Sequence, residues 1–266
     1  MPSGGQAAML TQVEIELQLP EGTLFNQSMG SILQGALMEQ VAPAWAEAMH
    51  TQNVRPYSQY GCIKEGKPIW RIHTLTEEAA EQMLSPLLRL SSLYLKQRNQ
   101  EIGLSHFQIV KQETFKEIEE KYWGTDKKIH HMDMNFLTSA SCKSQGGYAI
   151  FPMPHLIFKN LIKKWNAFSD GSTMEEVGIA DQLAQQMDVT DYQLHMHPFS
   201  LEGRRIRAFR GKVRYGFFKN DAASRLAATL ADFANYAGTG MKTSMGMGGT
   251  EAKVEFYKSP SVRNAL

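Results

Sequence analysis

The sequence predicts an α+β fold built from two tandem βαββαβ units, and three observations support this prediction. Apolar and polar residues alternate from Val13 to Leu19, a pattern typical of a half-buried strand. Apolar residues at helical spacing follow between Ser28 and His50, and strand and helix patterns complete the unit. The second half repeats this order of elements without repeating the sequence. Such units are typical of ferredoxin-like (RRM-like) domains, in which two helices cover one face of an antiparallel sheet.

The first half contains clear signals for the start and end of its elements. Pro43 is expected to kink the first helix or to split it in two. Thr76 is a favourable N-cap residue, and Glu77 and Glu78 suit the positive end of a helix that begins there. The remaining elements are strands at 57–64 and 68–74, this helix at 76–90 and a last strand at 104–110.

The second half follows a similar order, with one additional segment. Its predicted elements are a strand at 128–138, a helix at 156–168, a pair of strands at 192–199 and 205–218, a helix at 222–236 and a last strand at 252–257. The polar segment 173–187 is expected to be a further helix or an insertion. Asn220 or Asp221 caps the helix at 222–236. A boundary near Gly124 would give an N-terminal domain, 1–124, and a C-terminal domain, 125–266.

A glycine-rich loop, Gly238–Gly249, precedes the last strand and contains five glycines, one lysine and no acidic residue. Successive glycines can expose backbone N–H groups as a concave anion site, so the loop predicts a phosphate-rich partner. Met241 before Lys242 excludes a Walker A loop, and Thr243 excludes a dinucleotide fingerprint. The alternative is a flexible connector, which would not need a lysine. The candidate RNA-binding residues of this loop are Gly238, Gly240, Lys242, Gly246 and Gly248.

A basic run lies in the same predicted domain. Six basic residues fall within eleven positions that contain no acid, namely Arg204, Arg205, Arg207, Arg210, Lys212 and Arg214. Strand alternation places Arg205 and Arg207 on one face. A bulge at Phe209–Gly211 would bring the last three basic residues together on one face. Arginine forks suit phosphates, which favours RNA binding over a merely solvated surface.

Composition limits the classes of partner and compartment. The formal net charge is only +1, so a nucleic-acid surface requires local clustering of basic residues. Two distant cysteines, Cys62 and Cys142, favour a reducing cytoplasm over a disulfide scaffold. The sequence contains no run of about 18 apolar residues, which a membrane span would need. The first residues lack the pattern of a signal peptide. We therefore expect a cytoplasmic protein without a membrane partner.

Histidines provide the candidates for chemistry. His50 ends a predicted helix in front of a loop, where a side chain can reach a groove and can exchange a proton near neutral pH. A helix-capping role is the alternative. The pairs His130-His131 and His195-x-His197 could begin a metal site, but a structural role is favoured. We expect neither a metal nor another cofactor.

The sequence resembles the CRISPR-associated endoribonucleases that process precursor CRISPR RNA, within the superfamily of RAMP proteins. The most specific part is Phe233–Gly249, which is similar to the glycine-rich C-terminal signature of the family. The other similar segments are Gly30–Leu37, Met49-His50, Arg55–Ser58, Phe136–Lys143, Phe151–Pro154, Lys164–Asn166 and Phe209–Tyr215.

The resemblance implies metal-independent cleavage within the CRISPR repeat. The ribose 2′-OH attacks the adjacent phosphorus and leaves a 2′,3′-cyclic phosphate and a 5′-OH. His50 stands at the place of the family's catalytic histidine and would act as acid or base. Gly35 and Pro56 occupy the positions where some members have a tyrosine and a lysine. The candidates for an assisting residue therefore stay open: Ser28, Arg55, Tyr57 and Lys143.

Two alternatives to this enzyme stay open. One is a non-catalytic RAMP subunit that binds CRISPR RNA in an effector complex, and the other is a metal-dependent nuclease that uses His195 and His197. The expected partners are CRISPR repeat RNA, subunits of a CRISPR effector complex and a second copy of the chain in a homodimer.

Overall fold

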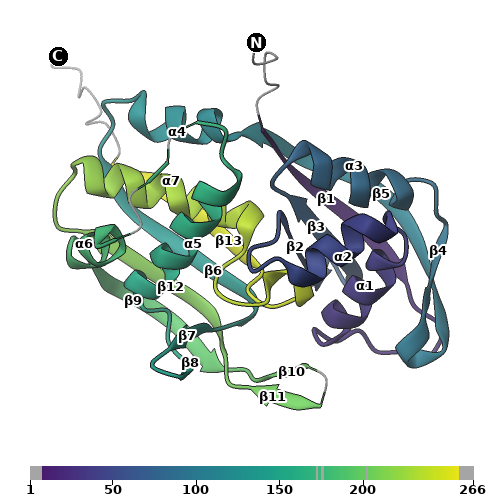
Figure 1. Ribbon diagram of the computed structural model, residues 1–266. Coiled ribbons are helices and arrows are strands. Elements are labelled where there is room, and N and C mark those ends of the chain that lie inside the picture. Colours follow the sequence, from purple (N-terminus) through teal and green to yellow (C-terminus); the bar gives the residue numbers. More distant parts are fainter. Residues whose placement is uncertain (1–7, 172, 175–176, 202, 258–266) are drawn as a thin grey trace, which may run out of the picture.

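The computed structural model describes residues 8–171, 173–174, 177–201 and 203–257. Within them lie two antiparallel sheets of five and four strands that share no strand, together with two short hairpins. The sheets stand side by side, each with helices packed on it (Figure 1). None of the described helices is long and apolar enough to cross a membrane.

The first sheet has the strand order β2-β3-β1-β5-β4. Its strands are β1 (Met9–Gln18), β2 (Tyr57–Lys64), β3 (Lys67–Thr74), β4 (Ser92–Leu95) and β5 (Gln100–Thr114). The helical elements of this half are α1 (Met29–Met38), α2 (Pro43–Thr51), α3 (Glu77–Leu87) and η1 (Lys96–Arg98). Apolar side chains of the sheet pack against α1, α2 and α3 in one core, which includes Val13, Ile15, Leu33, Leu37, Trp45, Trp70, Ile72 and Met83.

Most sequence signals of this half are confirmed. The expected long helix is split into α1 and α2, and Pro43 occupies the first turn of α2, where its missing N–H removes no helical bond. The Thr76 hydroxyl accepts the N–H of Ala79 at 3.2 Å and so caps α3. The sequence analysis did not predict β4, and the strand that it predicted at 104–110 is shorter than β5.

The second sheet has the strand order β13-β6-β12-β9. Its strands are β6 (Ile129–Ala140), β9 (Met187–Met196), β12 (Phe209–Phe217) and β13 (Thr250–Phe256). The two hairpins are formed by β7 (Cys142–Ser144) with β8 (Gly147–Ala149) and by β10 (Phe199–Leu201) with β11 (Arg204–Ile206). The helical elements are α4 (Phe115–Trp123), α5 (Pro154–Phe168), α6 (Ile179–Gln185), α7 (Ala222–Ala237) and η2 (Thr243–Met245).

The basic run does not form the single strand that the sequence suggested. Arg204 and Arg205 lie in β11 of a separate hairpin, whereas β12 starts only at Phe209. The reason is local packing: Phe199, Leu201 and Ile206 of the hairpin form a small core of their own with Met247. The bulge expected between Phe209 and Gly211 is confirmed as a register shift against β6.

Helix α4 was not expected from the sequence. The Thr114 side chain accepts the N–H of Glu117, and the Glu117 carboxylate accepts the N–H of Thr114, so the two residues form a capping box. Its apolar face packs in the core of the second half through Phe115, Ile118 and Tyr122. This helix precedes Gly124, so the last helix of the predicted N-terminal domain contacts the second sheet's layer of helices.

The glycine-rich loop forms a close contact between the two halves. A Cβ built on Gly246, whose φ is +98°, would lie 2.8 Å from the Cα of Gly30 in α1. The buried Gln59 amide then donates to the carbonyls of Gly30 and Ser244, at 2.7 and 2.9 Å. The two backbones can approach this closely because both residues at the contact are glycines without a Cβ. The loop therefore packs directly against α1 and β2.

Polar groups of β2 and β3 complete the contact between the halves. The Ser58 hydroxyl donates to the carbonyl of Tyr236 at 2.6 Å, which leaves its oxygen to accept from Nδ1 of His73 at 3.2 Å. His73 is buried and its Nε2 has no partner in the described part of the chain. Burial, with the neighbouring Arg71 charge, lowers the pKa of His73 to about 3. The ring is therefore neutral at the interface.

Replacing Gly246 should separate the loop from α1. We expect Gly246→Ala to lower the free energy of unfolding by about 3 kcal/mol, because the new Cβ needs a left-handed backbone and overlaps Gly30. Gly171→Ala is the control, since Gly171 has open space around its Cβ position. Urea unfolding measures both, and equal effects would contradict the packing role of Gly246.

His73 should make the fold sensitive to mild acid. A group with a folded pKa near 3 and an unfolded pKa near 6.5 stabilises the fold fully above pH 6.5 and loses this contribution as pH falls. Between pH 7.5 and pH 5 the loss is about 2 kcal/mol. His73→Gln should remove that part of the pH dependence in urea unfolding, whereas His195→Gln, at an exposed position, should retain it.

Candidate functional site

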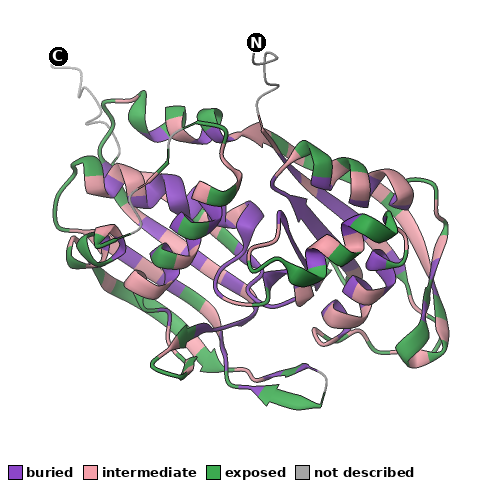
Figure 2. Ribbon diagram, viewed as in Figure 1, coloured by how far each residue is buried: buried purple, intermediate pink, exposed green. Residues whose placement is uncertain are grey.

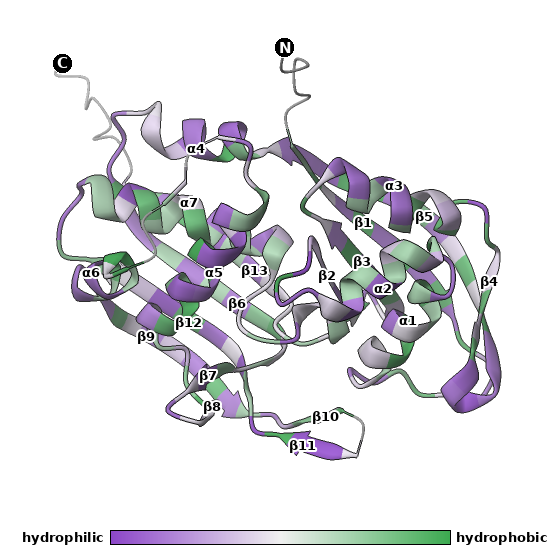
Figure 3. Cartoon of the chain, in the orientation of Figure 1, coloured by the Kyte–Doolittle hydropathy of each residue, from purple (hydrophilic) through white to green (hydrophobic). Residues whose placement is uncertain are grey.

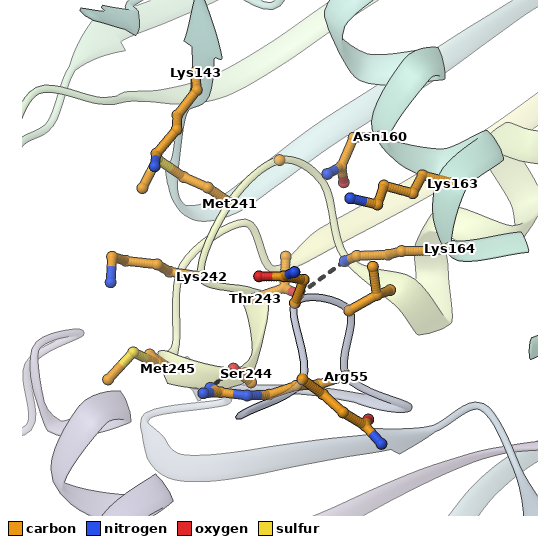
Figure 4. Close-up of a pocket in the computed structure, with 14 residues that line it drawn as sticks. Arg55, Lys143, Asn160, Lys163, Lys164, Met241, Lys242, Thr243, Ser244 and Met245 are labelled. Carbon is orange, nitrogen blue, oxygen red and sulfur yellow. Dashed lines mark hydrogen bonds between the residues drawn. The ribbon is translucent and has the colours of Figure 1, made fainter. Parts of the chain in front are cut away.

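A cleft of about 420 Å³ opens where the loop after α2 meets α5 and the glycine-rich loop. We call it the basic cleft, and it is lined by Gln52–Arg55, Lys143, Asn160, Lys163, Lys164 and Gly240–Met245. Both halves of the chain therefore contribute to it. Its lining contains five cationic side chains and no carboxylate, and Figure 4 shows Lys163, Lys164 and Asn160 reaching towards the loop from α5. A site with this charge suits an anion.

Lys164 is the buried cation of the basic cleft, with 7% of the residue exposed. Its Nζ donates to the carbonyl of Ala237 at 2.5 Å. It also donates to the hydroxyl of Thr243 at 2.8 Å, the bond that Figure 4 shows. Among the described residues, no carboxylate forms an ion pair with it. Burial lowers the pKa of Lys164 to about 7, because water no longer stabilises the ammonium.

Arg55 ties the first half to the rim of the cleft. Its Nε donates to the carbonyl of Met49 at 2.7 Å, and Nη1 donates to the Ser244 hydroxyl at 2.8 Å. One guanidinium thus bridges the end of α2 and η2. Lys143, Lys163 and Lys242 are exposed at the surface of the cleft and add charge that a ligand can reach.

His50 lies at the C-terminal end of α2 and is exposed. The segment that lines the basic cleft begins two residues later, at Gln52. The sequence-based proposal would have failed if this imidazole were enclosed in a core, and the structure leaves it accessible. His50 is not itself part of the cleft lining.

A second hollow, of about 510 Å³, continues from the basic cleft towards the β10–β11 hairpin. We call it the hairpin hollow, and it is lined by Tyr148, Leu201, Arg204, Arg205, Ile206 and Lys242. Lys242 lines both hollows, so the predicted arginines and the glycine-rich loop lie along one basic surface. Figure 2 shows the arrow of β11 largely exposed, and Figure 3 shows it largely hydrophilic.

The other members of the basic run lie elsewhere. Arg207 is exposed between β11 and β12, and Arg210 is half-buried at the start of β12. Lys212 lines a different hollow on the open face of the second sheet, together with Asp133, Asp191 and Glu251. Next to it, Arg214 donates to both oxygens of Asp133, at 2.7 and 2.9 Å. Lys212 therefore lies on a sheet face that also carries carboxylates, and the structure does not bring it to the basic cleft.

The predicted glycines are buried rather than displayed. Gly238, Gly240, Gly246 and Gly248 are all buried, and Gly246 is the one of these four whose neighbours lie in the first half. Several N–H groups of the loop donate within the protein, for example those of Met241 to the Ser141 carbonyl and of Gly248 to the Ser139 carbonyl, both at 2.9 Å. These contacts account for the glycines by packing, and a backbone contact between them and RNA stays a prediction.

The alternative histidine pairs have protein partners. The Nδ1 atoms of His130 and His131 lie 2.9 Å apart, and Nδ1 of His197 lies 2.7 Å from the Ser139 hydroxyl. Burial lowers the pKa of His197, and the Arg210 and His195 charges lower it further. In the described residues, no group of three or more His, Cys, Asp or Glu side chains is arranged to hold a metal ion.

The four candidates for an assisting residue differ in access. Tyr57 is buried, and burial raises the pKa of its phenol. The Ser28 hydroxyl is hydrogen-bonded to Asn26. Arg55 and Lys143 both line the basic cleft. The structure therefore favours the two cationic candidates as neighbours of a bound anion.

Sequence reasoning missed Lys163, Asn160 and the role of Lys164 in this site. A helical signal was present, because positions 160, 163 and 164 are three and four residues apart and share one face of α5. Nothing in the sequence shows, however, that this face lies against the glycine-rich loop some eighty residues later.

Comparisons with known proteins agree with this architecture. The family described as "CRISPR-associated endoribonuclease Cas6" matches residues 134–250. The Cas6 endoribonuclease of Streptococcus thermophilus is 30% identical over 226 residues, which cover 84% of this chain and 90% of that protein. That of Mycobacterium tuberculosis is 28% identical over 242 residues, covering 88% and 74%. A solved Cas6 product complex, 20% identical, has a TM-score of 0.75 over 92% of this chain and 99% of that one, which shows the shared fold. The chain belongs to the Cas6 family of CRISPR-associated endoribonucleases.

Proposed function

We propose that this protein is a metal-independent endoribonuclease that cleaves precursor CRISPR RNA within its repeats. The observation that carries the proposal is the position of an accessible histidine, His50, in the last turn of α2, two residues before the segment that lines a carboxylate-free basic cleft. Membership of the Cas6 family supports the same activity. A strand of RNA would lie along the basic cleft and the hairpin hollow, where its phosphates meet Lys242, Arg204 and Arg205.

The proposed reaction is a transesterification. The 2′-OH of the ribose attacks the adjacent phosphorus, the bond to the 5′-oxygen of the next nucleotide breaks, and that oxygen takes up a proton. The products are a 2′,3′-cyclic phosphate and a 5′-OH. His50 accepts the proton of the 2′-OH or donates one to the leaving oxygen. Arg55 and Lys143 are suited to stabilise the additional negative charge of the transition state.

We also propose that each half is a ferredoxin-like domain, divided near Gly124 as 1–124 and 125–266. In sequence order the four long strands of each half form the sheet order 4-1-3-2, which supports this classification. The first sheet uses only strands before Gly124 and the second only strands after it. Helix α4 would then be a contact that the N-terminal domain extends to its neighbour.

Removing the imidazole of His50 should abolish efficient cleavage. We expect His50→Ala to cut repeat RNA about 10² to 10⁴ times more slowly in single-turnover assays, because one proton transfer loses its catalyst. Binding of a repeat RNA with a 2′-deoxy sugar at the cleavage position should change little. His195→Ala is the matched control and should cut at the parental rate.

The reaction conditions separate the proposed enzyme from its rivals. Wild-type cleavage in EDTA, with a 2′,3′-cyclic phosphate on the product, would support the proposal. Loss of cleavage in EDTA and its return with manganese would instead favour a metal-dependent nuclease. Tight binding of repeat RNA without cleavage under either condition would favour a non-catalytic subunit.

Lys242 should contribute a phosphate contact. Lys242→Met is expected to weaken RNA binding and to reduce the slope of log K against log salt concentration by about 0.7, as expected for one phosphate contact on a single strand. Lys253→Met is the control, because Lys253 forms an ion pair with Glu255 on the open face of the second sheet. Titrations of fluorescent repeat RNA at several salt concentrations measure both slopes, and equal slopes for wild type and Lys242→Met would exclude the contact.

A further inference from the structure

Lys164 is a buried cation that lacks a counter-ion. Buried lysines are rare unless a carboxylate or another anion neutralises them, because removing an ammonium from water costs several kcal/mol. In the described part of the chain, the elements around Lys164 offer a carbonyl, a hydroxyl and the thiol of Cys142, but no carboxylate. The surroundings are suited to an anion that the protein does not supply itself.

Among the described residues, the titratable groups around Lys164 are either cationic or neutral, and none is an anion. Arg55 comes from the loop after α2, Lys143 from β7, Lys163 from α5 and Lys242 from the glycine-rich loop. The Cys142 thiol is neutral, since burial raises its pKa to about 11. An anion in the basic cleft would therefore meet a field to which every charged lining residue adds in the same sense.

The hydrogen bonds of Lys164 show what its proton would do. A neutral amine has two N–H donors, and both are used by Ala237 and Thr243. A third N–H exists only in the ammonium form. The charged form therefore has one donor to spare, and the neutral form has none.

We propose that the basic cleft seats one phosphodiester group of the RNA, and that Lys164 is the positioning residue that pairs with it and takes up a proton as the RNA binds. This inference rests on the proposed function, since the ligand is the same RNA. A phosphodiester is negatively charged throughout the neutral range, so the proton is gained by the lysine. The two bonds to Ala237 and Thr243 hold the ammonium at the junction of α7 and the glycine-rich loop.

The coupling predicts a particular pH dependence of RNA affinity. The free protein has Lys164 with a pKa of about 7, and a bound phosphate raises it. Below pH 7 the lysine is charged in both states and affinity is flat. Above pH 7 the free lysine is neutral, so affinity should fall by up to about tenfold per pH unit until the pKa of the complex is reached.

The test uses repeat RNA with a 2′-deoxy sugar at the cleavage position, titrated from pH 6 to pH 9 at constant salt. Wild type should show the decline above pH 7. Lys164→Met should bind about 10 to 100 times more weakly at pH 6.5 and show no such decline. Lys163→Met, which removes an exposed lysine of the same cleft, should weaken binding equally at every pH. Lys159→Met, on α5 outside the cleft lining, should behave as wild type.

Proton uptake and folding provide the remaining controls. Calorimetric titrations at pH 8 in two buffers with different ionisation enthalpies should show close to one proton taken up by wild type and less by Lys164→Met. Thermal unfolding tests whether this variant is folded. Lys164→Arg, a permanent cation, should bind without the decline above pH 7.

The outcomes separate this inference from the proposed function. A decline of the same size in wild type and Lys164→Met, or no decline in wild type, would overturn the role of Lys164 while cleavage continued. Absence of RNA binding and cleavage by wild type at every pH would overturn the proposed function itself.

Discussion

The close backbone contact between Gly30 and Gly246 is the constraint on which the rest of the structure depends. It allows the glycine-rich loop to lie against α1 and β2 without an intervening side chain, and Gln59 then binds both sides through its amide. The same contact brings Ser244 within reach of Arg55. Because the basic cleft is formed by the loop after α2, α5 and the glycine-rich loop, it exists only when the two halves are joined in this way.

The cleft concentrates positive charge in a chain that is almost neutral. The formal net charge is +1, yet five cations surround about 420 Å³ and no acid lines it. Bringing like charges together costs free energy, and burying Lys164 adds a desolvation cost. The fold lowers this cost by giving Lys164 two oxygen partners and by shifting its proton equilibrium towards the neutral amine. An anion that enters the cleft offsets the remaining repulsion.

The sequence predicted those features that depend on local patterns. Alternation revealed β1, Pro43 marked the start of α2, and the register shift at Gly211 followed from the spacing of the basic run. It could not predict features that depend on long-range packing. The glycines looked like a ligand cradle, but they are buried because other backbone approaches them: Gly30 of the first half at Gly246, and Ser141 and Thr239 of the second half at Gly240 and Gly248. Lys164 looked like part of a family block, and its position opposite Thr243 depends on how α5 and α7 pack. A strand pair that turns near Leu201 was expected, but its separation from β9 and β12 as the β10–β11 hairpin was not, because the small core of the hairpin includes Met247, more than forty residues further along the chain.

The distribution of charge also decides between two surfaces for RNA. An antiparallel sheet can bind single-stranded RNA on its open face, where side chains meet unstacked bases. On the second sheet this face carries Asp133 paired with Arg214 and Lys253 paired with Glu255, and Lys212 shares its hollow there with the carboxylates of Asp133, Asp191 and Glu251. On the first sheet, Ser58 and His73 of the corresponding face are buried against the second half. The basic cleft and the hairpin hollow, joined by Lys242, have no carboxylate in their lining. Along this junction the phosphates of an RNA strand therefore meet positive charge without repulsion from a carboxylate. The end of α2, which carries His50, lies beside the junction.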